Sequence, residues 1–124
     1  LITADTVVCI HDRILGKPAD RKEAISMLRE LSGNRHLVVT GVSVTTRTEQ
    51  LSFSSRTDVF FKHLSNEEII FYVDTYKPFD KAGAYGIQEW IGYIGIERIE
   101  GSFYNVMGLP IQKLYETLRK LQFQ

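Results

Sequence analysis

An acidic residue inside an apolar segment is the first position in the sequence where chemistry is expected. Asp5 lies between residues 1–4 and 6–8, in a segment whose residue types favour an extended strand that it interrupts. A lone carboxylate is costly to bury unless it is paired, bound to a metal or functional. At the carboxyl end of a strand, Asp5 could hold a divalent cation or act as a general base on water. The alternative is that the strand ends at Ala4 and Asp5 caps it or faces solvent.

A lysine in a stiff loop is the second candidate. Lys17 lies between Gly16 and Pro18, which together make a compact loop with little side-chain bulk. A lysine held in such a loop can act as a point charge on a phosphate group. The simpler alternative is an exposed loop lysine without a ligand.

A third cluster lies in residues 80–88, which read Asp-Lys-Ala-Gly-Ala-Tyr-Gly-Ile-Gln. The small residues let a ligand approach the backbone closely. Lys81 could neutralise a phosphate, and the amide of Gln88 could read a base edge with one donor and one acceptor face. The alternative is a short helix broken by glycines, because neither the Walker motif nor the dinucleotide-binding glycine motif occurs.

Three other patterns favour structural interpretations. Cys9 and His36 could form a nucleophile–base pair, but Cys9 lies in an apolar run and is better explained as a core cysteine. His11, His36 and His63 lack the spacing of metal ligands, which disfavours a structural zinc site. Phe60-Phe61-Lys62 resembles an RNA-stacking strand, although alternating core residues explain it more simply.

Composition limits the class of protein. The 124 residues carry 15 Lys and Arg, 15 Asp and Glu, and one Cys. Balanced charge disfavours broad nucleic-acid binding, and a single cysteine fits a reducing compartment such as the cytoplasm. No apolar run approaches the ~20 residues of a membrane span. With 44% hydrophobic residues, residues 1–124 are expected to form one ordinary globular domain.

The elements that would position these residues alternate between strands and helices. Asp20 and Ser65 are each followed three residues later by Glu, the spacing of a capping box at a helix start. The patterns predict helices over 20–32, over 65–75 and from Pro110 onward, and strands over 1–10, 36–44, 50–64 and 93–99. Strands 36–44 and 50–64 are expected to pair antiparallel through a turn at 45–48. The fold class is therefore mixed α/β.

Five short motifs, in this order along the chain, resemble those of the Maf family of nucleoside triphosphate pyrophosphatases, first named as septum-formation inhibitors. They are Ala4-Asp5-Thr6-Val7-Val8, Gly16-Lys17-Pro18, Thr40-Gly41-Val42, Asp80-Lys81-Ala82-Gly83 with Tyr85-Gly86-Ile87-Gln88, and Gly101-Ser102-Phe103-Tyr104-Asn105-Val106-Met107-Gly108-Leu109-Pro110. The resemblance implies a mixed, partly antiparallel sheet flanked by helices, as in Maf and ITPase proteins.

The resemblance also implies an activity and roles for individual residues. A nucleoside triphosphate would be cleaved to the monophosphate and pyrophosphate, with Mg²⁺ or Mn²⁺ as the cofactor. Asp5 would be the proton acceptor and Lys17 would contact phosphate. By their chemistry, Asp5 could also hold the metal and Lys81 could add a second phosphate contact. Thr6 and Gln88 fall on the specificity positions and resemble the subgroup that acts on dTTP and UTP. A cytoplasmic homodimer with no nucleic-acid or membrane partner is expected.

The sequence departs from the family pattern at its start. The family opens with a Ser-x-Ser-Pro-Arg-Arg loop that grips phosphate, and this chain, which opens at Leu1, does not contain it. We therefore expect that the N-terminal portion is missing and that these residues alone hydrolyse nucleotides poorly. Two other functions stay open, namely a non-catalytic nucleotide-binding module linked to cell division and a small RNA-binding domain that uses residues 60–62.

Overall fold

The computed structural model describes residues 1–122 and confirms a mixed α/β fold. Its sheet has the strand order β2-β1-β3-β4-β5, and every neighbouring pair is antiparallel. The strands are β1 (Ile2–Ile10), β2 (Arg13–Leu15), β3 (Arg35–Thr45), β4 (Gln50–Phe61) and β5 (Ile96–Glu100). The long β3–β4 hairpin expected from the sequence is confirmed.

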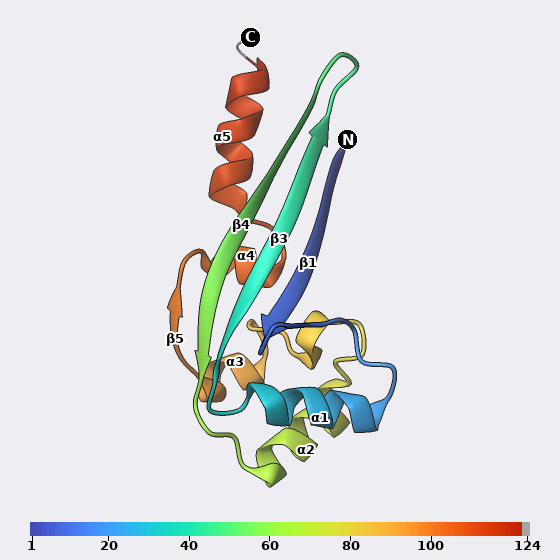
Figure 1. The fold of residues 1–124 in the computed structure, drawn as a ribbon, viewed down its shortest axis with the longest axis vertical. Helices are drawn as coiled ribbons and strands as arrows, with labels where there is room; N and C mark the ends of the chain where they lie inside the picture. The colour runs from blue at the N-terminus through green and yellow to red at the C-terminus, as the bar shows by residue number, and fades with distance from the viewer. Residues whose placement is uncertain (123–124) are drawn as a thin grey trace.

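The helices lie at different heights along this sheet (Figure 1). They are α1 (Arg21–Leu31), α2 (Asn66–Tyr76), the 3-10 turn η1 (Ala82–Ala84), α3 (Trp90–Gly95), α4 (Phe103–Met107) and α5 (Ile111–Gln122). Helices α1, α2 and α3 gather at one end of the long strands, whereas α5 runs beside their other end. Within residues 1–122, no helix has both the length and the apolar character that crossing a membrane requires.

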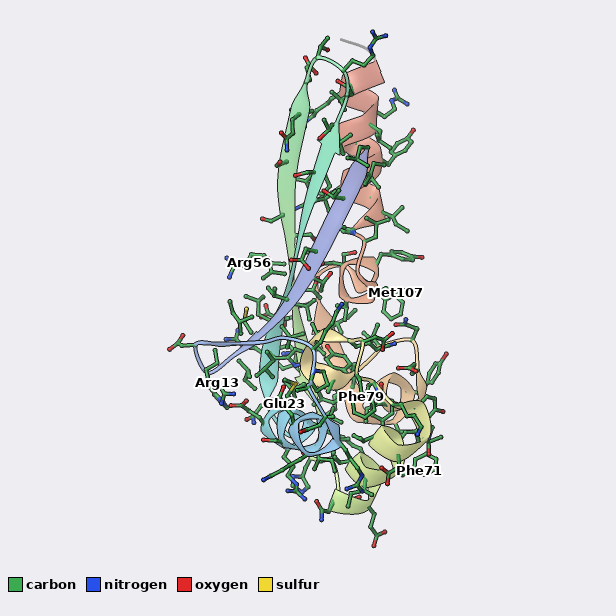
Figure 2. The ribbon with its side chains drawn as sticks, turned by 90° about the vertical axis from the view of Figure 1, so that its right-hand side faces the viewer. Arg13, Glu23, Arg56, Phe71, Phe79 and Met107 are labelled. Carbon is green, nitrogen blue, oxygen red and sulfur yellow. The ribbon has the colours of Figure 1, made fainter. Side chains whose placement is uncertain are left out.

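The two faces of the sheet have different environments. Directly opposed residues in antiparallel strands share a face, so the pairing of Val8 with Val38 and of Val38 with Thr57 defines one of them. All three side chains are buried. Val39 and its partner Arg56 lie on the other face. Figure 2 shows Arg56 projecting away from the side on which Met107 and α5 lie.

The hydrophobic core forms in two places on the face of the sheet that carries Val8, Val38 and Thr57. The larger cluster joins this face to α1, α2 and α3, with Leu28 and Ile91 fully buried. A smaller cluster joins Val42 and Val44 to Leu114 of α5. Each buried aliphatic side chain contributes about 1.5–3 kcal/mol of transfer free energy.

The predicted starts of the first two helices are confirmed, whereas α5 begins at Ile111, one residue after the expected Pro110. Asp20 caps α1 by accepting a hydrogen bond from the backbone N–H of Glu23 at 2.8 Å. Ser65 and Glu68 form the full capping box of α2. Arg21 and Asp74 then join the two helices through a 2.7 Å ion pair. Because that pair is exposed, solvent screens it and it adds little to stability.

Several expectations for β1 and the later elements are wrong in detail. Asp5 does not interrupt or end β1, which continues through it to Ile10, and only the second half of the strand is buried. The expected strand over 93–99 begins only at Ile96, because Tyr93 belongs to the short helix α3. The expected strand over 50–64 ends at Phe61. The helix α4 was not expected, since five residues are too few to show a helical period.

The interpretation of Phe61 as a core residue fits the structure, whereas the interpretation of Cys9 as a core cysteine is wrong, because Cys9 is half-buried on the face of the sheet opposite the core. Cys9 pairs with Leu37, so His36, one residue away, points to the opposite face of the sheet. The two side chains therefore cannot form a nucleophile–base pair. Phe61 is only 4% exposed and stacks on His36, which leaves it unavailable for stacking on RNA.

The buried His36 predicts how stability depends on pH. Burial lowers the pKa of His36 to about 4, and its Nε2 lies 2.6 Å from the Tyr85 hydroxyl. The unfolded chain takes up a proton near pH 6.5, whereas the folded chain resists until about pH 4. The free energy of unfolding should therefore fall by up to roughly 3 kcal/mol as the pH drops through this window, with no contribution above it.

Urea unfolding of wild type and of His36→Phe at pH 7.5 and pH 5 measures this effect. His36→Phe should lose most of the stability difference between the two pH values, while the exposed His63→Phe should keep it. An unchanged difference in His36→Phe would show that another group is responsible.

Candidate functional site

A cavity of about 420 Å³ opens beside β1. Its walls come from segments far apart in the chain, and the lining includes residues 5–8 of β1, residues 16–17, most of residues 80–88 and residues 106–108. The four positions singled out in the sequence all line it, and so does Lys81. These positions are Asp5, Thr6, Lys17 and Gln88.

The cavity exists because β1 is an edge strand along part of its length. The short β2 pairs only with residues 8–10 of β1, so residues 5–7 lack a strand on that side within the described residues. Asp5 and Thr6 point to opposite faces, as consecutive strand residues do. Both reach the cavity because it opens at the sheet edge. Asp5 is exposed, and its side chain makes no hydrogen bond or ion pair within residues 1–122.

A backbone hydrogen bond positions Lys17. The N–H of Gly83 donates to the carbonyl of Gly16 at 3.1 Å, which ties the loop of Lys17 to η1. Gly83 has a φ of +71°, and a Cβ there would lie 3.0 Å from a methyl group of Val8. Only glycine satisfies both the backbone angle and this close approach. The glycine expected to allow a ligand in instead packs η1 onto β1.

Two lysines and an aspartate form the charged rim. Lys81 Nζ lies 3.3 Å from Asp80 Oδ1. The pKa of Asp80 lies below its ordinary value, mainly because Lys81 donates this hydrogen bond, with smaller contributions from its own backbone and the charges of Lys81 and Lys17. Both lysines thus lie near the same carboxylate. Asp80 is exposed, so an anionic ligand that replaces it gives up only a weak, solvent-screened contact.

Hydrogen bonds to the side chain of Tyr72 support the turn that carries Gln88. The buried hydroxyl of Tyr72 donates to Glu89 Oε1 at 2.7 Å and accepts from the N–H of Gly86 at 3.0 Å. The pKa of Tyr72 is raised by burial and by its hydrogen bond to Glu89. The exposed side chain of Gln88 makes no hydrogen bond within the described residues, so its amide is available to a ligand.

Gly92 closes this turn. A Cβ at Gly92 would lie 1.8 Å from the carbonyl oxygen of Ile87, which no rearrangement of a side chain can relieve. The start of α3 therefore packs directly against the backbone next to Gln88.

The far wall depends on Asn105, which sequence reasoning did not single out. Asn105 is fully buried, and its Nδ2 donates to the carbonyl of Val38 at 3.2 Å and to Thr57 Oγ1 at 2.9 Å. These bonds fix α4 to the sheet, so that residues 106–108 form a wall of the cavity. The motif over residues 101–110 marked this segment, but spacing alone gave Asn105 no role. Tyr72 carried no signal either, since it lies in an ordinary helical pattern.

These features define a pocket for a small anionic ligand, with two ammonium groups, two exposed carboxylates and a free amide around one opening. The chain matches the family described as "Maf-like protein" over residues 1–121. It therefore belongs to the Maf family.

Curated relatives share the same name. The chain is 62% identical over 121 residues to the dTTP/UTP pyrophosphatase of Bacteroides thetaiotaomicron, covering 98% of this chain and 63% of the relative. It is 63% identical over 119 residues to that of Porphyromonas gingivalis, covering 96% and 60%. For Cytophaga hutchinsonii the identity is 51% over 121 residues, covering 98% and 56%. The chain thus spans about 60% of the length of these relatives.

The Tyr72 contact predicts the effect of removing one hydroxyl group. Tyr72→Phe leaves the buried N–H of Gly86 unpaired, so the free energy of unfolding should fall by about 1–3 kcal/mol. Hydrogen exchange at Gly86 and Gln88 should also become faster, because the turn loses its support.

Tyr76→Phe is the matched control, since Tyr76 lies one turn later on α2 and is 38% exposed. It should change stability by less than about 0.5 kcal/mol. Equal effects from the two variants would contradict the role given to Tyr72.

Proposed function

We propose that this chain supplies, as a single domain, the nucleotide site of a pyrophosphatase that hydrolyses dTTP and UTP to the monophosphate and pyrophosphate. The observation that carries the proposal is the meeting of Asp5, Thr6, Lys17 and Gln88 in one cavity. The names of relatives at about 60% identity support the substrate class.

In the proposed reaction, each residue acts according to its chemistry. Lys17 and Lys81 bind the phosphates and offset their charge as it shifts toward the leaving pyrophosphate. Asp5 acts as the general base and takes a proton from the attacking water. The water oxygen bonds to the α-phosphorus, the bond from this phosphorus to the oxygen bridging the β-phosphate breaks, and the pyrophosphate leaves with the bonding electron pair. Gln88 and Thr6 bind the polar edge of the base.

We propose that Mg²⁺ or Mn²⁺ is the cofactor and that Asp5 is its protein ligand. The described residues contain no group of three or more His, Cys, Asp or Glu side chains suited to a metal. An exposed carboxylate without a protein partner still fits, because Mg²⁺ is usually held by one or two carboxylates together with substrate phosphates and water. The bound cation would neutralise phosphate charge and polarise the bond that breaks.

Metal removal should therefore abolish turnover. Pyrophosphate release from UTP by the full-length protein should stop in excess EDTA and return when Mg²⁺ is added beyond the chelator. Turnover that continues in EDTA would overturn the proposed metal requirement.

Asp5→Asn should reduce kcat by at least about a hundredfold, because the amide cannot accept the proton of the attacking water. Pyrophosphate release from dTTP by the full-length protein measures this. Asp12→Asn is the control, since Asp12 is an exposed carboxylate in the β1–β2 turn and does not line the cavity. Asp12→Asn should retain wild-type turnover, and wild-type turnover by Asp5→Asn would remove Asp5 from the mechanism.

We also propose a cytoplasmic homodimer. Ile111, Tyr115 and Leu118 recur at helical spacing on α5, and each is at least 39% exposed. A second copy could cover this stripe. Light scattering should give twice the chain mass, whereas a single chain mass at micromolar concentration would contradict the dimer. A cytoplasmic location fits a chain whose single cysteine, Cys9, is free.

A second candidate function is a non-catalytic nucleotide-binding module linked to cell division. Lys17, Lys81 and Gln88, which line the cavity, could bind a nucleotide without any catalytic step. It predicts thermal stabilisation by dTTP or UTP without pyrophosphate release. Turnover by the full-length protein would exclude it.

A further inference from the structure

We propose that Thr40 sets the base specificity of the cavity by fixing the hydrogen-bond direction of Thr6. With that direction fixed, Thr6 offers the ligand an acceptor and favours a pyrimidine whose ring nitrogen N3 carries hydrogen. The inference rests on the proposed function and deepens it, since it explains how uracil and thymine are separated from cytosine.

Three groups form a series of hydrogen bonds that leads inward from the cavity. Thr6 lines the cavity and is half-buried, and its Oγ1 lies 2.9 Å from Thr40 Oγ1. The hydroxyl of Thr40 lies 3.2 Å from the backbone carbonyl oxygen of Asn105. Thr40 is fully buried, so water cannot satisfy its hydroxyl group instead.

The inner end of this series determines its direction. A carbonyl oxygen only accepts, so Thr40 must donate its single proton to Asn105 if that hydrogen bond is to form. Thr40 can then only accept from Thr6, and both contacts are hydrogen bonds. The reverse direction would leave one hydrogen bond and set two oxygen lone pairs against each other in a buried site, which is costly. Hydrogen bonds aligned in one direction also strengthen one another.

The acceptor at the end of the series is immobile. Asn105 is held by its side-chain bonds to Val38 and Thr57, and its carbonyl also accepts from the N–H of Gly108 at 3.0 Å. These contacts hold the carbonyl in place on the buried face of β3. Thr40 therefore has a fixed partner, and its orientation passes to Thr6.

A Thr6 hydroxyl that donates inward presents only its lone pairs to the cavity. Uracil and thymine carry N3–H, which can donate to these lone pairs. Cytosine has an unprotonated N3, which can only accept and would face Thr6 lone pair against lone pair. The amide of Gln88 can turn over and offer either face, so Gln88 alone does not separate these bases. The discrimination therefore belongs to Thr6 as oriented by Thr40.

Thr40→Val in the full-length protein tests the proposal. Valine keeps the branched shape but has no hydroxyl group, so Thr6 becomes free to donate into the cavity. The ratio of kcat/KM for UTP to that for CTP should fall on the order of tenfold, the effect of about one hydrogen bond. Thr40→Ser restores the hydroxyl group and should restore most of the ratio.

Ser32→Ala is the control. The half-buried hydroxyl of Ser32 accepts from the backbone N–H of Leu64 at 2.6 Å and touches neither Thr6, Thr40 nor Asn105. Ser32→Ala should lose stability but keep the UTP/CTP ratio. A wild-type ratio in Thr40→Val, or an equal fall in Ser32→Ala, would overturn the proposal and leave the pyrophosphatase activity standing.

The ligand provides a test that does not depend on a variant folding. N3-methyl-UTP cannot donate from N3, so wild-type protein should turn it over no faster than CTP. Turnover equal to that of UTP would overturn the role of Thr6 as acceptor. A wild-type protein that releases pyrophosphate from neither UTP nor dTTP would overturn the proposed function itself, and this inference with it.

Discussion

The incomplete pairing of β1 is the constraint on which the site depends. Because β2 pairs only with residues 8–10, the stretch from Asp5 to Val7 keeps a sheet edge open in the described structure. An edge allows consecutive side chains on opposite faces to reach one ligand, which the interior of a sheet does not permit. Asp5 and Thr6 can thus serve different parts of the same nucleotide, with chemistry at one residue and recognition at the next.

Buried polar groups hold the remaining walls around this edge. Tyr72 supports the turn of Gln88, and Asn105 fixes α4 against the sheet. Each has several hydrogen-bond partners in a low-dielectric interior, where losing one partner costs more than at the surface. The exposed groups Asp5, Lys17 and Gln88 therefore project from rigid backbone, and their own side chains make no hydrogen bond in the described residues that ligand binding must first break.

Local signals predicted the elements that depend on local physics. The caps at Asp20 and Ser65 and the β3–β4 hairpin were readable from residue types and spacing. The helical conformation of Tyr93 and the helix α4 could not be predicted, because tertiary packing rather than a residue period determines the secondary structure of such short segments. The cavity residues were found as separate motifs. Their meeting, and the supports Tyr72, Asn105 and Thr40, depend on contacts across the fold that no local pattern encodes.

The central claim is that one cavity at the edge of β1 binds the nucleotide. Amide NMR of the full-length protein, titrated with the non-hydrolysable α,β-imido analogue of dUTP and Mg²⁺, tests it most directly. The largest shifts should fall on residues 5–8, 16–17, 80–88 and 106–108, with little change along α5. Shifts that centre instead on the hollow lined by Tyr93, Arg98 and Phe103 would contradict it.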